Sequence, residues 1–202
     1  HSVRARSNAL QCLIELCRRL ILLGAEKSES PSSVLRPILE TIYGMLILKA
    51  GETSTTIPLE IARSTVVSLN ALAQKYIRIL DAFNVSRILS HACSWIGDGR
   101  PPVRVLVIRL LRILVQKLPD YTIQHYKELL LEAVFEGQLT ADVTQKVRKA
   151  NRLLLEALVD RFGVDVLAKS TDKSEWLKQL KAVEKFRRRK QNKLATASTT
   201  SA

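Results

Sequence analysis

Aromatic residues, glycine and proline are all scarce in this sequence, and their scarcity is the first guide to its fold class. Of 202 residues only 5% are aromatic, seven are glycine and six are proline. Leucine, isoleucine, valine, alanine, arginine and lysine dominate, and no segment sustains the alternating pattern of a half-buried strand. Because 47% of the residues are apolar, the chain can bury a sizeable core. The composition predicts a helical protein.

Cysteine is scarce as well, and its pattern excludes a disulfide framework. Cys12, Cys17 and Cys93 are odd in number, show no CxxC spacing and lie within apolar helical patterns. We therefore expect buried thiols in a reducing compartment. The chain opens with His1-Ser2 and shows no signal-peptide pattern, so we expect it to be a segment of a longer protein. Arginines interrupt even the longest apolar run, 103–115, which excludes a membrane span there.

The motifs of common catalytic and metal sites are missing. His91 and His125 are 34 residues apart, and neither has a cysteine or carboxylate at ligand spacing. No glycine-rich loop precedes a helix, and neither GxSxG nor HExxH occurs. The carboxylate pairs Asp98/Asp120 and Glu128/Glu132 fall in turns or on an exposed helix face, where carboxylates are usually solvated. We expect no enzymatic activity, no cofactor and no metal.

Acidic residues are also scarce relative to basic ones, most of all near the C-terminal end of the sequence. The chain has 32 Lys and Arg against 19 Asp and Glu, a formal charge of +13, which favours a polyanionic partner such as nucleic acid or an acidic protein. Between Lys173 and Lys193 there are nine basic residues and two acidic ones, so this stretch carries +7 of the total.

What is present throughout is helical periodicity, with apolar residues at i, i+3, i+4 and i+7. It predicts helices over residues 3–23, 32–50, 58–79, 82–97, 101–118, 121–136, 141–162 and 173–191, with a short turn at 164–169. Alternate helices begin with a small or β-branched residue followed by arginine, as in Val3-Arg4, Ala62-Arg63, Val103-Arg104 and Val147-Arg148. The later two spacings between these arginines, 41 and 44 residues, suit two-helix repeats of the HEAT or armadillo kind.

This pattern predicts an all-α protein, an α-solenoid of three to four helical hairpins over residues 1–172. Residues 173–193 are expected to form a basic capping helix, and the Ala/Thr/Ser-rich residues 194–202 a disordered tail. A stripe of Trp176, Leu177, Leu180, Val183 and Phe186 on the last helix is expected to dock it onto the end of the solenoid. A groove for a partner is the alternative use of this stripe.

Two sets of cations are the candidate RNA-binding residues. The first lies on the last helix and consists of Lys181, Lys185, Arg187, Arg188, Arg189, Lys190 and Lys193. The second is expected to form a ridge on two stacked helices and consists of Arg104, Arg109, Arg112, Lys146 and Lys149. Guanidinium and ammonium groups neutralise phosphates and release their counterions. Two interpretations compete for the first set: a nuclear import signal, and a solvated helix end whose cations complement the C-terminal dipole. For the arginines of the second set the alternatives are a solvated face and stems that pack over neighbouring helices.

The stretch Val147-Arg148-Lys149-Ala150-Asn151-Arg152-Leu153-Leu154-Leu155-Glu156-Ala157-Leu158-Val159-Asp160-Arg161-Phe162-Gly163-Val164-Asp165, followed by a basic helix, resembles the C-terminal part of the ribosomal RNA-processing protein twelve family. The pair of helices over 86–118 is also similar to the penultimate repeat of that family. The resemblance extends over about residues 84–193. The short tail and the loops at 26–33 and 51–56 depart from the family pattern.

The resemblance implies a non-enzymatic HEAT-repeat factor of ribosome assembly, located in the nucleolus and nucleus. Such a factor would bind pre-ribosomal RNA and other assembly factors during maturation and export of the small subunit, with no membrane or small-molecule partner. A transport-type or adaptor solenoid that binds peptides on its concave face is the rival hypothesis. It requires acidic or asparagine-rich concave helices, and the candidate helices 32–50 and 121–136 carry only a few acids.

Overall fold

The computed structural model describes residues 3–46, 56–136 and 144–199, which are helical and contain no strand. The helices are α1 (Val3–Glu26), α2 (Pro31–Gly44), α3 (Leu59–Tyr76), α4 (Ala82–Trp95), α5 (Pro101–Lys117), α6 (Asp120–Gln124), α7 (Lys127–Glu136), α8 (Gln145–Phe162), α9 (Val164–Lys169) and α10 (Ser174–Thr199), with a 3-10 turn, η2 (Ile77–Ile79), after α3. The predicted all-α class is confirmed.

Several predicted boundaries differ from the observed ones. The helix predicted over 32–50 ends at Gly44, and the one predicted over 121–136 is divided into α6 and α7. Helix α8 begins at Gln145 because the Thr144 hydroxyl caps it, accepting a hydrogen bond from the Val147 backbone N–H at 3.4 Å. Residues 47–50 and 141–143 of these predictions lie outside the described residues.

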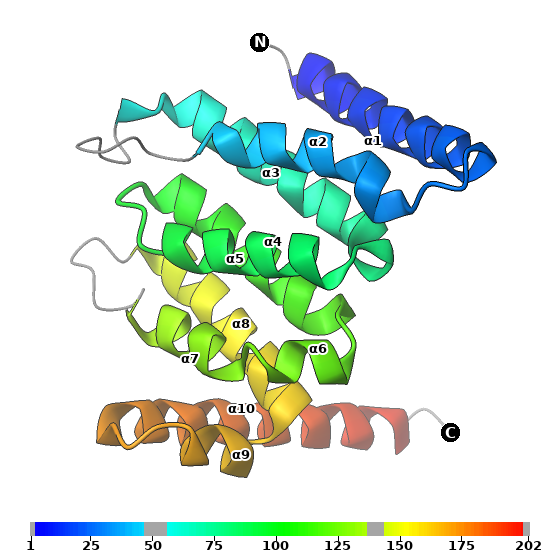
Figure 1. Cartoon of the computed structure of the whole chain (residues 1–202). Coiled ribbons are helices and arrows are strands. Elements are labelled where there is room, and N and C mark those ends of the chain that lie inside the picture. Colours follow the sequence, from blue (N-terminus) through cyan, green and yellow to red (C-terminus); the bar gives the residue numbers. More distant parts are fainter. Residues whose placement is uncertain (1–2, 47–55, 137–143, 200–202) are drawn as a thin grey trace.

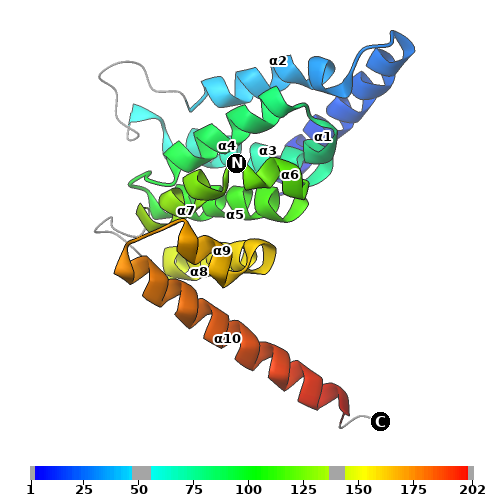
Figure 2. The same ribbon diagram turned by 60° about the horizontal axis from the view of Figure 1, so that its bottom comes forward.

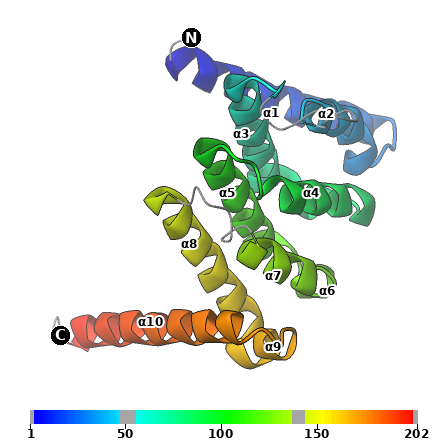
Figure 3. The same ribbon diagram turned by 90° about the vertical axis from the view of Figure 1, so that its left-hand side faces the viewer.

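The helices lie in two layers (Figure 1). Helices α1, α3, α5 and α8 follow one another in the first layer, and α2, α4 and the α6–α7 pair form the second (Figure 3). Within the first layer α3 packs on α5, and α5 packs on α8. Consecutive helices in the chain therefore alternate between layers, and each hairpin stacks on the one before it.

The same buried register recurs in three helices of the first layer. It begins at the residue before the repeated arginine and continues at intervals of four, three, one and three residues. The buried sets are Ala62, Val66, Leu69, Asn70 and Ala73 in α3, Val103, Val107, Leu110, Leu111 and Leu114 in α5, and Val147, Asn151, Leu154, Leu155 and Leu158 in α8. Full burial of one of its aliphatic side chains is worth about 1.5–3 kcal/mol, so this repeated stripe contributes substantially to the core.

Buried polar side chains tie neighbouring hairpins together. The Asn70 amide of α3 donates hydrogen bonds to the Val66 carbonyl at 2.8 Å and to the Leu106 carbonyl of α5 at 3.0 Å. In the second layer the buried Ser32 hydroxyl of α2 accepts a hydrogen bond from the Asp81 backbone N–H, just before α4. These bonds satisfy groups that would otherwise be buried without partners, and they fix the register between hairpins.

Helix α10 crosses beneath the end of the stack, as the docking prediction required. The Trp176 ring stacks on Phe135 of α7 with centroids 4.4 Å apart, and Leu180 and Val183 are buried. Helix α10 packs against α8 and α9. The stack covers Leu180 and Val183, so this part of the stripe is not a groove for a partner, whereas Phe186, which was expected to dock with them, is 45% exposed. The C-terminal part of α10 extends beyond the other helices (Figure 2).

The disorder predicted for residues 194–202 is wrong as far as the described backbone goes, because α10 continues to Thr199. No glycine or proline interrupts the chain between 174 and 199, and extending a helix that has already formed costs far less than starting one. Residues 200–202 lie outside the described part of the chain.

The prediction of buried thiols is confirmed for two of the three cysteines. Cys17 and Cys93 are buried, and burial raises the pKa of both thiols, that of Cys93 to about 12. Cys12 is exposed on α1, so the prediction is wrong for this residue. Helix α1 has a first-layer neighbour, α3, on one side only, and its opposite face is therefore open.

Candidate nucleic-acid interface

One face of α10 carries cations and no acid. Leu180 and Val183 point at the stack, and at 100° per residue the exposed cations fall on the opposite side, within an arc of roughly 100°. We call this the α10 basic arc; it consists of Lys178, Lys181, Lys185, Arg188 and Arg189, whose side chains are all exposed. The two acids of this stretch, Glu175 and Glu184, lie outside it. The arc is therefore a continuous positive strip along the outer side of the helix.

The predicted cations of α10 differ in how they are paired. Arg187 lies outside the arc and its Nε contacts the Asp160 carboxylate of α8. Arg188 lies at the edge of the arc and pairs with Glu184 at 2.6 Å. Lys181, Lys185 and Arg189 form no ion pair with any described residue. The side chains of Lys190 and Lys193 lie outside the described part of the chain. The strongest candidates for phosphate contact are thus Lys181, Lys185 and Arg189.

The length of α10 shows whether its cations could serve to complement the helix dipole. A helix end can attract cations because they complement its dipole, but this effect is confined to the last turn. Helix α10 ends at Thr199, and its last turn contains no basic residue. Arg189, the last member of the α10 basic arc, stands ten residues before that end. Complementing the helix dipole therefore does not explain the arc.

A second exposed set of cations lies at the beginning of α8. Lys146, Arg148, Lys149 and Arg152 are all exposed, and the first turn contains no acid. The dipole makes the N-terminal end of a helix an unfavourable place for cations, so helix stability does not account for this set either. The Arg152 guanidinium lies 4.9 Å from the ring centroid of Phe186, which connects the basic part of α8 to α10.

The part of the predicted ridge that lies on α5 is exposed only in part, and for Arg104 the prediction is wrong. Arg104 is only 1% exposed, and its Nε donates a hydrogen bond to the Ile96 carbonyl at 3.1 Å, so it is a core residue and cannot contact RNA. Arg112 is partly buried, and among the described residues its Nε has no hydrogen-bond partner. Only Arg109 is exposed as predicted. Lys146 and Lys149, the α8 half of that ridge, are exposed.

The burial of Arg104 could have been recognised from spacing. Arg104 stands four and seven residues before Ile108 and Leu111, which are both buried, and these intervals place it on the core side of α5. The contacts of Arg152 with Phe186 and of Arg187 with Asp160 could not have been recognised in this way. They join α8 and α10, and their geometry depends on how the two helices cross.

The described residues include no group of three or more His, Cys, Asp or Glu side chains that could hold a metal ion. In the same ranges every helix is too short or too polar to cross a lipid bilayer. No protein-family model matches the sequence, and no curated protein matches it. The function must therefore be inferred from the surface chemistry of α8 and α10 and from the resemblance of their sequence.

Proposed function

We propose that this chain is a HEAT-type α-solenoid segment that acts without catalysis as a scaffold and binds RNA through the α10 basic arc and the neighbouring cations of α8. The main support for this proposal is the position of the α10 basic arc. It lies on a helix that is anchored to the stack by Leu180 and Val183, while the cations face away from it. Such an arrangement holds positive charge rigidly in solvent, where phosphates can reach it.

The solenoid part of the proposal is supported by the repeated buried register of α3, α5 and α8. Helical hairpins that stack only on their neighbours are what defines a HEAT or armadillo array. The register is the same in all three helices although two of its positions hold asparagine, the fourth in α3 (Asn70) and the second in α8 (Asn151). A single hairpin could not bury both of its sides, so the stacking itself supplies the core.

The setting that we propose is ribosome assembly. The sequence that resembles the ribosomal RNA-processing protein twelve family coincides with α8, the turn at Gly163 and the start of α9, and the basic helix α10 follows. Gly163 has a φ of 78°, a left-handed conformation that favours glycine and that ends α8. On this proposal the RNA is pre-ribosomal, the protein partners are small-subunit assembly factors, and the location is the nucleolus and nucleus.

The rival adaptor function has less support in the residues. It requires exposed acids or asparagines along a peptide-binding face. Asn84 of α4, which lies in the same layer as the candidate helices α2 and α7, is buried. Glu40 of α2, an acid that such a face would use, is placed 3.7 Å from Arg87. We therefore put RNA binding first.

Fluorescence anisotropy with labelled RNA at several salt concentrations tests the proposal. We expect the triple variant Lys181→Gln, Lys185→Gln, Arg189→Gln to lose about ten- to hundredfold in affinity near 0.1 M salt, because each lost phosphate contact forfeits counterion release. The slope of log affinity against log salt is expected to fall by about 2 on single-stranded RNA.

The matched control removes the same charge elsewhere, through Arg4→Gln, Lys27→Gln and Lys75→Gln, which are exposed on α1, after α1 and on α3. The control is expected to bind within about twofold of the unmodified chain, since its cations lie beyond a Debye length of about 10 Å from the arc. Equal losses in the two triple variants would show that only net charge matters. Salt-independent binding of the unmodified chain would contradict the proposal altogether.

A further inference from the structure

Phe186 is an aromatic side chain that the docking of α10 leaves half in solvent. Its exposed fraction is 45%, whereas Leu180 and Val183 of the same helix are buried. It follows Val183 by three residues and precedes Arg189 by three, so it lies on the flank of α10 between the buried stripe and the basic arc. An apolar ring in this place contributes little to the core and borders directly on positive charge.

The ring also faces a second basic element. The Arg152 guanidinium of α8 lies 4.9 Å from its centroid, and Arg152 in turn pairs with Glu156 at 3.4 Å. Arg148 and Lys149, one turn earlier on α8, are exposed. Phe186 therefore lies where the cations of α8 meet those of α10. Phe186 and Arg152 both belong to helices that the core holds in place.

We propose that Phe186 and Arg152 form a stacking platform for an unpaired base, and hence that the RNA bound at this surface is single-stranded. This inference rests on the proposed function, which it narrows to a class of RNA. A single strand can lay its phosphates along the cations of α8 and α10 while one base stacks on the exposed Phe186–Arg152 surface. An A-form duplex keeps its bases stacked inside, so it can use the cations but not the ring.

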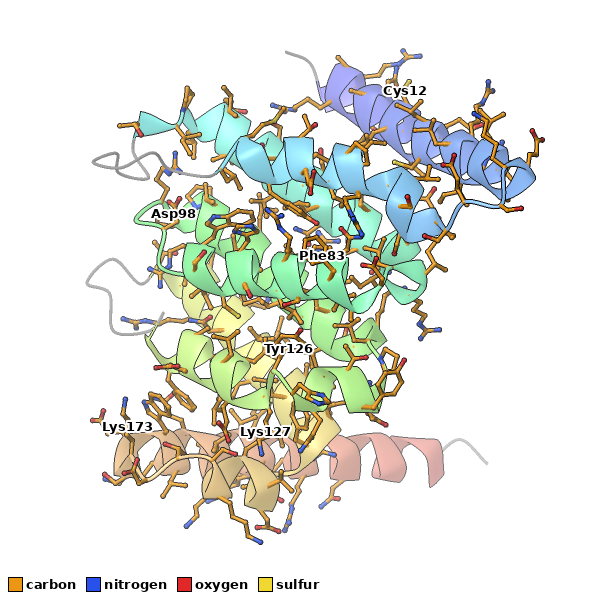
Figure 4. All side chains as sticks on the ribbon, viewed as in Figure 1. Cys12, Phe83, Asp98, Tyr126, Lys127 and Lys173 are labelled. Atoms are coloured by element: carbon orange, nitrogen blue, oxygen red, sulfur yellow. The ribbon has the colours of Figure 1, made fainter. Side chains whose placement is uncertain are left out.

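The chain contains a matched control for this ring. Phe83 of α4 is 50% exposed and has the guanidinium groups of Arg36 and Arg87 at 5.0 and 5.6 Å from its centroid. These two arginines are balanced by acids, because Arg36 lies 3.3 Å from Asp81 and Arg87 lies 3.7 Å from Glu40. Phe83 is thus a half-exposed ring that also contacts arginine, but the arginines beside it are each paired with an acid. It lies on α4, on the face of the second layer (Figure 4).

The test compares Phe186→Leu and Phe83→Leu with the unmodified chain by anisotropy. Three probes of equal length are used: a single-stranded RNA, the same strand with abasic nucleotides, and a duplex. Phe186→Leu is expected to weaken binding of the single strand about 5- to 160-fold, the equivalent of about 1–3 kcal/mol for one stacked base. Its binding of the abasic strand and of the duplex is expected to stay within about twofold. Phe83→Leu is expected to change none of the three, and circular dichroism checks that both variants are folded.

A loss for Phe186→Leu that is equal on the single strand and the duplex, a loss in Phe83→Leu of similar size, or no loss at all would overturn the inference. If Phe186→Leu fails to fold, the unmodified chain decides the matter, because equal affinity for the normal and the abasic strand overturns it as well. Failure of the proposed function is a separate result, in which none of the three probes binds the unmodified chain with salt dependence.

Discussion

Helices α5 and α10 are both rich in cations, yet the structure uses these cations in opposite ways. Helix α5 contains three arginines and no acid, and it lies between α3 and α8 with α4 against it. Its Arg104 is consequently buried and bonded to the Ile96 carbonyl. Helix α10 has packing partners along one side only, so Lys181, Lys185 and Arg189 face solvent.

The comparison teaches that the number of packed neighbours decides what a basic side chain does in a stacked helical protein. A buried cation must have its donors satisfied, because an unsatisfied buried charge costs several kcal/mol. It therefore becomes part of the structure and is lost to any partner. An exposed cation on the outer side of the terminal helix, such as Lys181, Lys185 or Arg189, has no such requirement and stays available to an external anion.

The largest loss of stability is expected on replacing Arg104, the buried cation of α5. Replacing Arg104 with alanine leaves a cavity in the core of α5 and removes a donor from the Ile96 carbonyl. We expect a loss of about 2–4 kcal/mol in the free energy of unfolding, measured by urea denaturation. The matched variant Arg109→Ala, on the exposed side of the same helix, is expected to stay within about 0.5 kcal/mol. Similar losses in the two variants would contradict the assignment of Arg104 to the core.

An intermediate loss of stability is expected on weakening the packing of α10 against the stack. Leu180 is fully buried, and Leu180→Ala is expected to cost about 2–3 kcal/mol, chiefly by loosening α10 from α8 and α9. Hydrogen exchange is the measurement, and the amides of 176–187 should lose protection before those of α5 do. Lys181→Ala, the adjacent exposed position, should leave the exchange unchanged. Uniform loss of protection over the whole chain would show that α10 is not a separately opening element.

The smallest change in stability is expected for the ion pair that joins α10 to α8. Asp160→Asn removes the partner of Arg187, a pair whose side chains are 57% and 33% exposed, so the stability loss should be about 0.2–1 kcal/mol. The released guanidinium should strengthen RNA binding by up to about fivefold at 0.1 M salt, the gain of one phosphate contact. Asp165→Asn on α9 removes an equal charge without touching Arg187. If both variants bind RNA equally well, the pair with Arg187 has no part in the effect.

Much of the fold followed from the sequence because helical periodicity and the core register are local properties. In the structure, the buried register of three helices begins at the first residue of the repeated motif, at Ala62-Arg63, Val103-Arg104 and Val147-Arg148. The motif misled about its second residue, since Arg63 is partly exposed, Arg104 is buried and Arg148 is exposed. Arg104 donates a hydrogen bond to the carbonyl of Ile96 at the end of α4, and a periodic pattern does not show such a contact between helices.

The candidate site was predictable in its charge but not in its extent. The run of cations after Lys173 is a matter of composition, so the sequence alone is enough to single out α10. Which of these cations are paired depends on Asp160, which lies on another helix. The role of Phe186 likewise depends on another helix, because its contact with Arg152 exists only where α10 crosses α8.

By itself the sequence determined the helical class, the buried register of the stacked helices and the concentration of positive charge near residues 173–193. These properties depend on residues a few positions apart along one helix. It took the tertiary structure to decide that α10 presents its cations away from the stack, that Arg187 pairs with Asp160, and that Phe186 joins the basic surfaces of two helices. Burial and pairing depend on neighbours far apart in the chain, and packing alone brings those neighbours together.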